Sequence, residues 1–316
     1  MDDGCGLRKI SPRFLRDAAL IVVPVIAIMA ILPSLYSNHL LLFNFVVFLT
    51  LAQGVNILYG FTGYLPFGYV GFFGAGAYGF SVAVLHLKAP PLAALIAAGA
   101  AAGALGLLLA PLLRLSGAYF SIANLAASLA VLQIISNPNL EDITRGPYGI
   151  SLTGVFNPTL AYAMALVILA ATLLFVAYLR SSNFGLALQA IRENLFSASM
   201  AGIDVVRARM IAWLACALVA GFTGGVFAWY VSVFFPETVF GAEFSIFAIV
   251  FALFGGTSTL LGPIIGVVIL YGVYNVIGVS APQYFQLIYG FLIMALVLFL
   301  PNGLTSLLQR RGIDVP

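Results

Sequence analysis

Long apolar stretches separated by short polar breaks run along almost the whole chain. A helix that crosses a bilayer needs about 20 mostly apolar residues, because roughly 30 Å of hydrocarbon must be covered at about 1.5 Å per residue. The pattern predicts about ten such helices and hence an all-α membrane protein, with a short, glycine-interrupted eighth span. The expected spans are 18–36, 39–58, 68–86, 91–113, 117–136, 159–179, 210–232, 244–258, 262–280 and 284–300.

Composition agrees with this fold class. Apolar residues make up 63% of the 316 residues and charged residues only 7%, whereas soluble domains carry roughly a quarter charged residues. The net charge of +3 is too small to indicate a nucleic-acid partner. Cys5 and Cys216 lie far apart with no histidine or cysteine cluster near either, so we expect no disulfide, no metal site and no cofactor.

Basic residues orient the expected spans. If the N-terminus lies in the cytoplasm and ten spans alternate, only Lys88 and Arg145 fall outside. Cytoplasmic loops of membrane proteins carry an excess of Lys and Arg, so this strong bias predicts that both termini are cytoplasmic. The basic residues expected inside are Arg8, Lys9, Arg13, Arg16, Arg114, Arg180, Arg192, Arg207, Arg209, Arg310 and Arg311.

The same topology divides the chain into regions. We expect a cytoplasmic N-terminal segment at 1–17, a membrane domain at 18–300 and a cytoplasmic tail at 301–316. The membrane domain includes one long polar cytoplasmic loop at 180–209. The first apolar stretch is too long for a cleaved signal and many spans follow it, so we expect it to remain as a helix.

Charged residues are absent from the middle of every expected span. Intramembrane charges usually mark proton relays or ion paths, so their absence argues against a proton-coupled carrier and an intramembrane metalloenzyme. Lys9 follows Arg8 and Lys88 follows Leu87, which excludes a glycine-lysine phosphate loop. The chain is therefore expected to be no enzyme, and uphill transport would need energy from another subunit. A sodium-coupled carrier stays open, because backbone carbonyls can hold sodium.

Glycine interrupts the helical pattern in two segments, at 60–79 and 254–272. Glycines three or four residues apart let helix backbones approach closely, which is the ordinary explanation. Paired interruptions in two halves of a chain also line solute paths in transporters. Since the expected spans 39–136 start outside and 210–300 start inside, the two halves are possible inverted repeats.

A few polar side chains lie within the expected spans. An unpaired amide costs free energy in hydrocarbon, so each should face another helix or a wet path. Hydrogen bonding between helices is the commoner role. The candidates for a substrate pathway are Gln53, Asn56, Tyr119 and Asn124.

The loop at 180–209 carries apolar residues at helical spacing, from Leu186 to Ala198. Arg192 lies on the opposite side of this expected helix, and Gly202 would end it in a left-handed conformation. A short amphipathic helix on the membrane surface and a docking element for a cytoplasmic partner both explain the pattern.

Three stretches of the chain resemble branched-chain amino-acid ABC importer permeases, the LivM-like family. They are F-G-L-A-L-Q-A-I-R-E-N with A-S-M-A-G-I at 184–203, S-G-A-Y-F-S-I-A-N-L-A at 116–126 with I-T-R-G-P-Y-G-I at 143–150, and G-G-T-S-T-L-L-G-P-I-I-G at 255–266. The resemblance extends in the same order from about 40 to 304. It implies a type II ABC-importer-like permease of the bacterial inner membrane that moves branched-chain or related amino acids.

The resemblance also implies partners: a second permease subunit in a heterodimer, two cytoplasmic ABC ATPases and a periplasmic solute-binding protein. By the same carry-over, the ATPase-coupling helix contains Ala190, Arg192, Glu193, Asn194 and Gly202. The chain departs from the importer pattern at Phe196-Ser197-Ala198, where Glu-Ala-Ala is usual, and at Arg145, where glycine is more frequent.

Other functions stay open at this point. A stand-alone secondary carrier or channel for small neutral solutes would share the same composition, and an ABC permease for urea or amides would share the same motifs. Arg145, with Glu141 and Asp142, lies in the expected external loop at 137–158. These charges suit either a solvated turn or contact with a binding protein.

Overall fold

The computed structural model describes residues 12–280 together with 290–291, 294 and 303–304. The long helices in this part are α1 Pro12–Leu35, α2 His39–Val55, α3 Val70–Leu85, α4 Pro91–Leu108, α5 Gly117–Ile135, α7 Pro158–Ser181, α10 Val205–Val231, α12 Ala242–Gly255 and α13 Leu261–Ser280. The shorter elements are η1 Asn56–Gly60, η2 Ala110–Arg114, η3 Pro138–Leu140, α6 Glu141–Thr144, η4 Gly146–Tyr148, β1 Ile150–Ser151, η5 Thr153–Val155, α8 Asn183–Glu193, α9 Leu195–Met200, β2 Val233–Phe234 and α11 Pro236–Val239.

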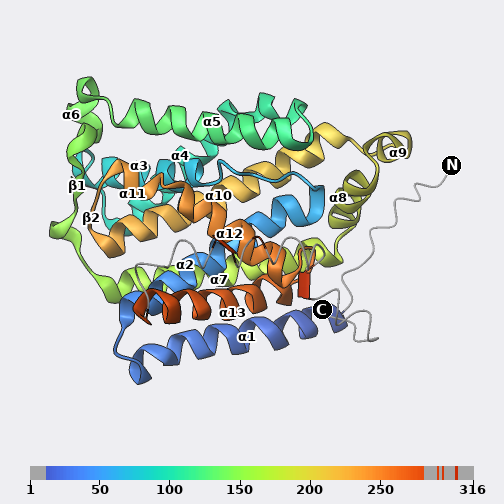
Figure 1. The fold of residues 1–316 in the computed structure, drawn as a ribbon, viewed down its shortest axis with the longest axis horizontal. Coiled ribbons are helices and arrows are strands. Elements are labelled where there is room, and N and C mark those ends of the chain that lie inside the picture. The colour runs from blue at the N-terminus through green and yellow to red at the C-terminus, as the bar shows by residue number, and fades with distance from the viewer. Residues whose placement is uncertain (1–11, 281–289, 292–293, 295–302, 305–316) are drawn as a thin grey trace.

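Most of the long helices run along the longest axis of the molecule (Figure 1). Six helical segments are long and apolar enough to cross a membrane, and the shorter apolar helices Ile21–Leu35, Val70–Leu85 and Leu261–Asn275 lie among them in the described residues. These nine segments correspond to the first nine expected spans. The expected span at 284–300 lies almost wholly outside the described residues.

Some boundaries differ from the expected ones. α1 already begins at Pro12, within the expected polar segment. α2 continues directly into the π-helix η1, so this helical segment extends from His39 to Gly60. Residues 63–69 form no helix, and α3 starts only at Val70. The expected helix at 91–113 ends at Leu108, where Pro111 interrupts α-helical hydrogen bonding and η2 follows.

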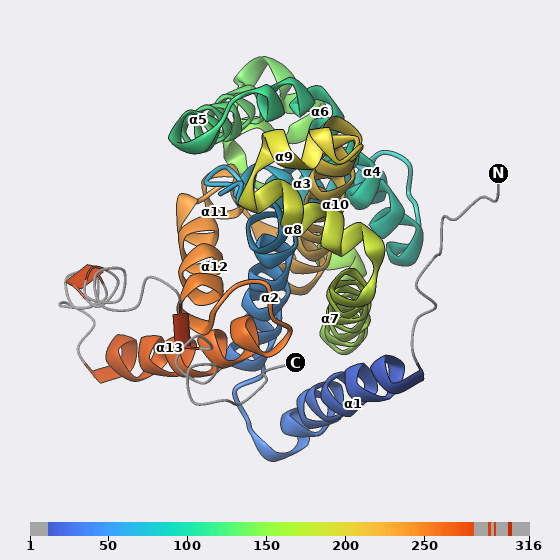
Figure 2. The ribbon, with the colours of Figure 1, turned by 90° about the vertical axis from the view of Figure 1, so that its right-hand side faces the viewer.

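The helices α2, α3 and α10 form the centre of the bundle (Figure 2). α3 and α10 approach closely at Gly76, because a Cβ atom there would overlap the Gly221 carbonyl. Trp213 of α10 lies fully buried against the Phe72 ring, at 4.9 Å between ring centroids. Small residues thus bring the two backbones together and large rings fill the space beside them, as expected where apolar attraction between helices is weak in lipid.

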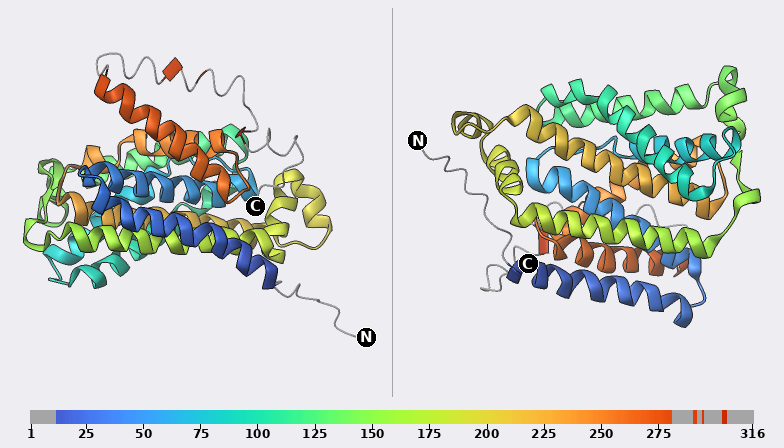
Figure 3. Two further views of the ribbon diagram at one scale, coloured as in Figure 1. Left: turned by 90° about the horizontal axis from the view of Figure 1, so that it is seen from below. Right: turned by 180° about the vertical axis from the view of Figure 1, so that it is seen from behind.

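α1 lies at the edge of the bundle beside α7, and both panels of Figure 3 show this pair running side by side. The Tyr162 hydroxyl of α7 donates a hydrogen bond to the Met29 carbonyl of α1 at 2.7 Å. This carbonyl is available because Pro33, four residues later, has no N–H to donate to it. The bond therefore satisfies a backbone acceptor that the helix itself leaves unpaired.

The two ends of the molecule carry different elements. β1 pairs antiparallel with β2 at one end, next to α6, whereas α8 and α9 lie at the other (Figure 1). The α8–α9 end also holds Arg209, which donates to the Leu113 carbonyl and lies over the Tyr64 ring. The described basic residues at that end are Arg13, Arg16, Arg114, Arg180, Arg192, Arg207 and Arg209, and those at the opposite end are Lys88 and Arg145. This distribution of basic residues between the two ends agrees with the one that the sequence predicts for the two sides of the membrane.

Candidate functional site

The two glycine-interrupted segments meet inside the protein. α2 changes to the π-helix η1 at Asn56, and α12 ends at Gly255 before a short turn at 256–260. A Cβ atom on Gly60 would lie 2.8 Å from the Ser258 nitrogen, so the two interruptions are in direct contact. π-Helical turns are rare and often occur at functional sites. The meeting point is therefore our candidate functional site.

Gln53 and Asn56 hold this contact from the α2 side, and both side chains are completely buried. The Gln53 amide donates to the Leu260 carbonyl at 2.9 Å. The Asn56 amide donates to the Thr259 carbonyl at 2.9 Å and to the Gln53 oxygen at 3.3 Å, and its oxygen accepts from the Ser258 N–H at 2.8 Å. These bonds satisfy the backbone of the turn, so both predicted pathway residues would have to release them to contact a solute.

Ser258 has an unusual backbone conformation, with φ at 67°. A left-handed conformation at a residue other than glycine costs about 1–3 kcal/mol and persists only where the surroundings enforce it. Here the Ser258 hydroxyl donates to the Gly60 carbonyl at 2.5 Å, while its N–H is held by Asn56. The turn at 256–260 thus stores strain that the contact with η1 maintains.

Arg192 reaches the same place from α8. Its Nη1 donates to the Gly60 carbonyl at 2.6 Å and to the Ser258 hydroxyl oxygen at 2.5 Å. The Arg192 side chain also passes over Gly63, where an added Cβ would lie 3.4 Å from its Cγ. We expected Arg192 only as part of the partner-facing helix, and its guanidinium instead joins α8 to both interrupted segments.

The loop at 180–209 forms two helices rather than the single expected one. Asn194 breaks the helical backbone, with φ at −156° and ψ at 108°, and its side-chain oxygen accepts from the N–H groups of Phe196 and Ser197 at 3.0 Å. Asparagine at this position competes with the helix for backbone N–H groups and begins α9 as its N-cap. The prediction of a single helix that continues from Leu186 to Gly202 is therefore wrong. The left-handed Gly202, with φ at 84°, is confirmed.

α8 and α9 present one face to the bundle and another away from it. Leu188 and Ile191 are buried beneath α8, and Ala190 is half-buried. Glu193 and Asn194 are exposed, and large apolar side chains nearby are exposed as well, with Phe196 at 72% and Met200 at 76%. Such exposed apolar side chains suit contact with the membrane surface or with another protein.

The other two predicted pathway residues lie on α5, and the structure does not bring them together. Tyr119 is 76% exposed, whereas Asn124 is fully buried beside Gly68. Both polar atoms of the Asn124 side chain, and the Ser128 hydroxyl one turn further on, lack a hydrogen-bond partner among the described residues. A buried polar group left unpaired costs about 1–3 kcal/mol, so the burial of Asn124 and Ser128 without partners calls for an explanation in terms of function.

The non-helical residues 63–69 run between α5 and the start of α3. The Ser121 hydroxyl of α5 donates to the Leu65 carbonyl at 2.8 Å, and the Val70 N–H donates to the Ser245 hydroxyl of α12 at 2.7 Å. Non-helical backbone at membrane depth is tolerated where protein buries it or where it lines a cavity. This segment connects the candidate site directly to α5.

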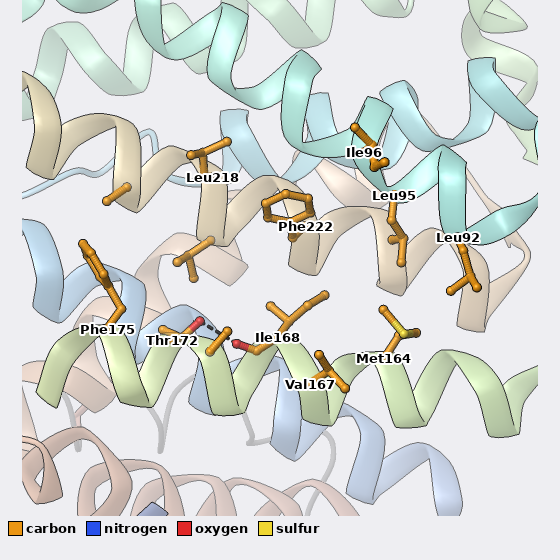
Figure 4. Close-up of a pocket in the computed structure, with 13 residues that line it drawn as sticks. Leu92, Leu95, Ile96, Met164, Val167, Ile168, Thr172, Phe175, Leu218 and Phe222 are labelled. Atoms are coloured by element: carbon orange, nitrogen blue, oxygen red, sulfur yellow. Dashed lines mark hydrogen bonds between the residues drawn. The ribbon is translucent and has the colours of Figure 1, made fainter. Parts of the chain in front are cut away.

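An apolar groove of about 530 Å³ lies between α4, α7 and α10 (Figure 4). Leu95, Phe175 and Phe222 are among the side chains that line it. Thr172 is the polar member of the lining, and its hydroxyl is already bonded to the Ile168 carbonyl at 2.8 Å. The lining offers a polar solute almost no hydrogen-bond partners, so we do not take the groove as the candidate solute path.

Ser258, Gly60 and Ser128 were not among the site residues predicted from the sequence. Ser258 and Gly60 lie within the two interrupted segments, but nothing in their local sequence shows that they pair across about 200 positions. Ser128 follows Asn124 by one helical turn, and this spacing places both on one face of a helix. That spacing was the available signal for the buried polar pair on α5.

An all-helical apolar bundle with interrupted helices that meet inside it is typical of multi-pass membrane transport proteins. Comparison with known families identifies the particular group. The chain belongs to the family described as branched-chain amino acid transport system / permease component, whose model matches residues 39–297. It is thus an ABC-type permease, and the resemblance seen in the sequence is confirmed.

The individual relatives of the chain are also named as transport permeases. The chain is 28% identical over 297 residues to the high-affinity branched-chain amino acid transport system permease protein LivM of Salmonella typhimurium and to that of Escherichia coli, with 84% of this chain and 69% of each relative covered. It is 27% identical over 216 residues to the L-arabinose ABC transporter permease protein AraH of Azospirillum brasilense, covering 63% of this chain and 61% of that protein. No solved structure shows significant similarity.

Proposed function

We propose that the chain is the membrane-spanning subunit of an ATP-driven importer for branched-chain or related amino acids in a bacterial inner membrane. The family and the LivM relatives support an importer of amino acids. Ten spans, the last within 284–300, and an inverted relation between the two halves complete the proposed type II importer architecture. The subunit provides half of a gated path, and partner ATPases supply the energy.

The observation that carries the proposal is the α8–α9 segment. It lies at the end of the bundle where most of the described arginines gather, and this excess of basic residues supports a cytoplasmic position for that end. Phe196 and Met200 are exposed there, beyond the membrane helices. We propose that an ABC ATPase docks on this face through Glu193, Asn194 and the exposed apolar residues of α9, with Gly202 ending the docking element.

A solute path along α5 fits the burial pattern. Only 22% of α5 is buried, compared with 78% of the α2–η1 segment, so a wide face of α5 is free. Tyr119 and Ile122 lie on this free face. A second permease subunit packed beside it would enclose a path. Asn124 and Ser128 would become available to a solute when residues 63–69 and the start of α3, which lie against them at Gly68 and Gly71, withdraw. These two side chains would offer an amino acid of zero net charge hydrogen bonds to its polar groups.

The opposite end suits a periplasmic solute-binding protein. Arg145 adopts a left-handed conformation at the end of α6, with φ at 63°, and is exposed beside the acidic residues Glu141 and Asp142. Tyr148 nearby is exposed as well. Charges and an aromatic side chain on a turn held by the β1–β2 pair form a defined surface, and complementary charges on a binding protein would orient its docking.

A sugar importer is the second candidate, because AraH is named as an L-arabinose permease and is similar to the chain over 216 residues. Asn124 and Ser128 could bond to sugar hydroxyls as well as to an amino acid. Urea and short amides would use the same uncharged groups. In such systems the binding protein selects the solute, so titrating the cognate binding protein with radiolabelled leucine, L-arabinose and urea identifies which class is carried.

Reconstitution in liposomes tests the role of the chain. We expect solute uptake only when the chain is combined with its partner permease, its ATPases, the binding protein and ATP. Uptake by the chain alone, uphill or facilitated, would contradict the subunit role and establish a stand-alone carrier or channel. An ATPase variant that binds but does not hydrolyse ATP is the matched control, because it preserves the assembly while removing the energy source.

A further inference from the structure

We propose that Arg192 is a positioning residue that transmits movement of α8 to both interrupted membrane segments through Gly60 and Ser258. This inference rests on the proposed function, in which ATPases act on the α8–α9 end. It goes beyond that function because it assigns a transmission site inside the permease, distinct from the surface on which an ATPase docks.

The first step is the direction of the Arg192 side chain. α8 packs on the bundle through Leu188 and Ile191, which are almost completely buried. Arg192 and Glu193, which follow Ile191, are both exposed, but the Arg192 guanidinium reaches back to bond to two groups of the bundle. Arg192 therefore contacts the bundle while its neighbour Glu193 is free to contact a partner. A movement that the partner imposes on this turn of α8 would be carried to the contacts of Arg192 with Gly60 and Ser258.

The second step is the shared atom. One nitrogen, Arg192 Nη1, donates to both the Gly60 carbonyl and the Ser258 hydroxyl oxygen. The Ser258 hydroxyl donates in turn to the same Gly60 carbonyl. The three groups form a closed triangle, so neither interrupted segment can move relative to the other, or relative to α8, without breaking at least two of its bonds.

The third step is the strain at Ser258. Its left-handed backbone is held by the Asn56 side chain on one side and by the triangle on the other. When α8 moves, the bonds of the triangle break and the turn at 256–260 becomes free to relax. In this proposal the turn has two arrangements, one held by these bonds and one relaxed, as transmission between distant sites requires.

The fourth step is the connection to the path. Gly60 ends η1, and the chain continues through residues 63–69 to the contacts with α5. Ser121 of α5 is bonded to Leu65, and Asn124 lies against Gly68. Displacement of Gly60 therefore pulls on the backbone that lies against Asn124 at Gly68 and, through the start of α3, on the backbone that lies against Ser128 at Gly71. The triangle is placed where an ATPase-driven movement would uncover the proposed solute contacts.

A double-mutant cycle in the complete reconstituted importer tests this role. Arg192→Ala removes the shared donor, and Ser258→Ala removes the hydroxyl but keeps the N–H that Asn56 holds. We expect each to reduce the solute moved per ATP hydrolysed by about 5- to 150-fold, the usual range of coupling between sites. The double variant should be little worse than either single one, because both break the same triangle.

Two further measurements separate transmission from docking and folding. Capture of the ATPases by each variant should equal that of the unaltered chain, since the docking face is unchanged. Arg192→Lys should retain part of the coupling, because it keeps a charged donor. Arg114→Ala, at an exposed arginine of the same end, is the matched control and should leave coupling unchanged. If Arg192→Ala reduces the yield of folded chain, Arg192→Gln and Ser258→Ala provide the test.

Several outcomes would overturn the inference. Loss of ATPase capture with Arg192→Ala would make Arg192 a docking residue, and an unchanged ratio of solute to ATP in both single variants would remove its role in transmission. Additive effects would show that Arg192 and Ser258 act separately. Failure of the unaltered complex to couple uptake to ATP would instead contradict the proposed function, so the two failures are distinguishable.

Discussion

The Asn56 side-chain oxygen accepts a hydrogen bond from the Ser258 N–H at 2.8 Å, although the two residues are 202 positions apart. Asn56 begins a π-helix in the first interrupted segment, and Ser258 has a left-handed backbone in the second. A buried amide thus satisfies a strained turn, and the two halves of the membrane domain are joined by polar contacts where each helix breaks.

Replacing Asn56 with alanine should lower stability. The change leaves the Ser258 N–H, the Thr259 carbonyl and the Gln53 oxygen without the partner they have now. We expect a loss of about 1–3 kcal/mol for each buried group that stays unpaired. Thermal unfolding of the purified chain in detergent measures this as a lower midpoint. Asn139→Ala, at an exposed asparagine, is the control, and an equal midpoint for the two variants would remove the structural role of Asn56.

Gly76→Ala should separate α3 from α10. A Cβ atom at position 76 would overlap the Gly221 backbone, which cannot move without shifting the whole helix. Such overpacking typically costs about 1–3 kcal/mol, and we expect a matching fall in the thermal midpoint. Gly272→Ala is the control, because no heavy atom lies within 4 Å of the Cβ built there. Similar midpoints for both variants would show that the close approach at Gly76 is unimportant.

Phe196→Asp should weaken ATPase docking without affecting the fold. Phe196 is 72% exposed at the start of α9, and large aromatic side chains usually provide most of the binding energy of an interface. We expect the affinity for the ATPase to fall at least about tenfold, which corresponds to about 1.4 kcal/mol. Co-purification and light scattering in detergent measure this. Phe235→Asp, at an exposed position of the opposite end, should retain full capture; equal losses would place the docking face elsewhere.

Labelling from either side of the membrane tests the orientation. In a Cys5→Ser background, we expect a membrane-impermeant maleimide to reach Lys88→Cys from outside intact cells and Arg207→Cys only in inside-out vesicles. Arg207 lies at the α8–α9 end, and its partner Asp204 is on the same exposed turn at 3.0 Å. The remaining cysteine, Cys216, is buried and should stay unlabelled in either preparation. The reverse labelling pattern would invert the proposed topology and place α8 and α9 outside the cell.

The extent of the membrane helices could be predicted from the sequence, because the hydrocarbon thickness sets a length that apolar stretches must meet. The break at Asn194 was also readable: asparagine is a preferred N-cap, and we followed the apolar spacing across it instead. The pairing of Gln53 and Asn56 with residues 258–260 was not readable, since it depends on how distant helices pack. The role of Arg192 escaped prediction for the same reason, because an arginine at a helix end is usually turned toward water.

The proposed division of roles between Arg192 and Phe196 has a consequence for how importers of this kind diversify. In this proposal, ATPase recognition and transmission of its movement fall to different side chains of one short segment, separated by the break at Asn194. Substitutions on α9 can therefore exchange one motor for another while the internal linkage stays intact. A chimaera in which α9 comes from another permease should therefore bind that permease's ATPase and still couple ATP hydrolysis to opening of the same solute path.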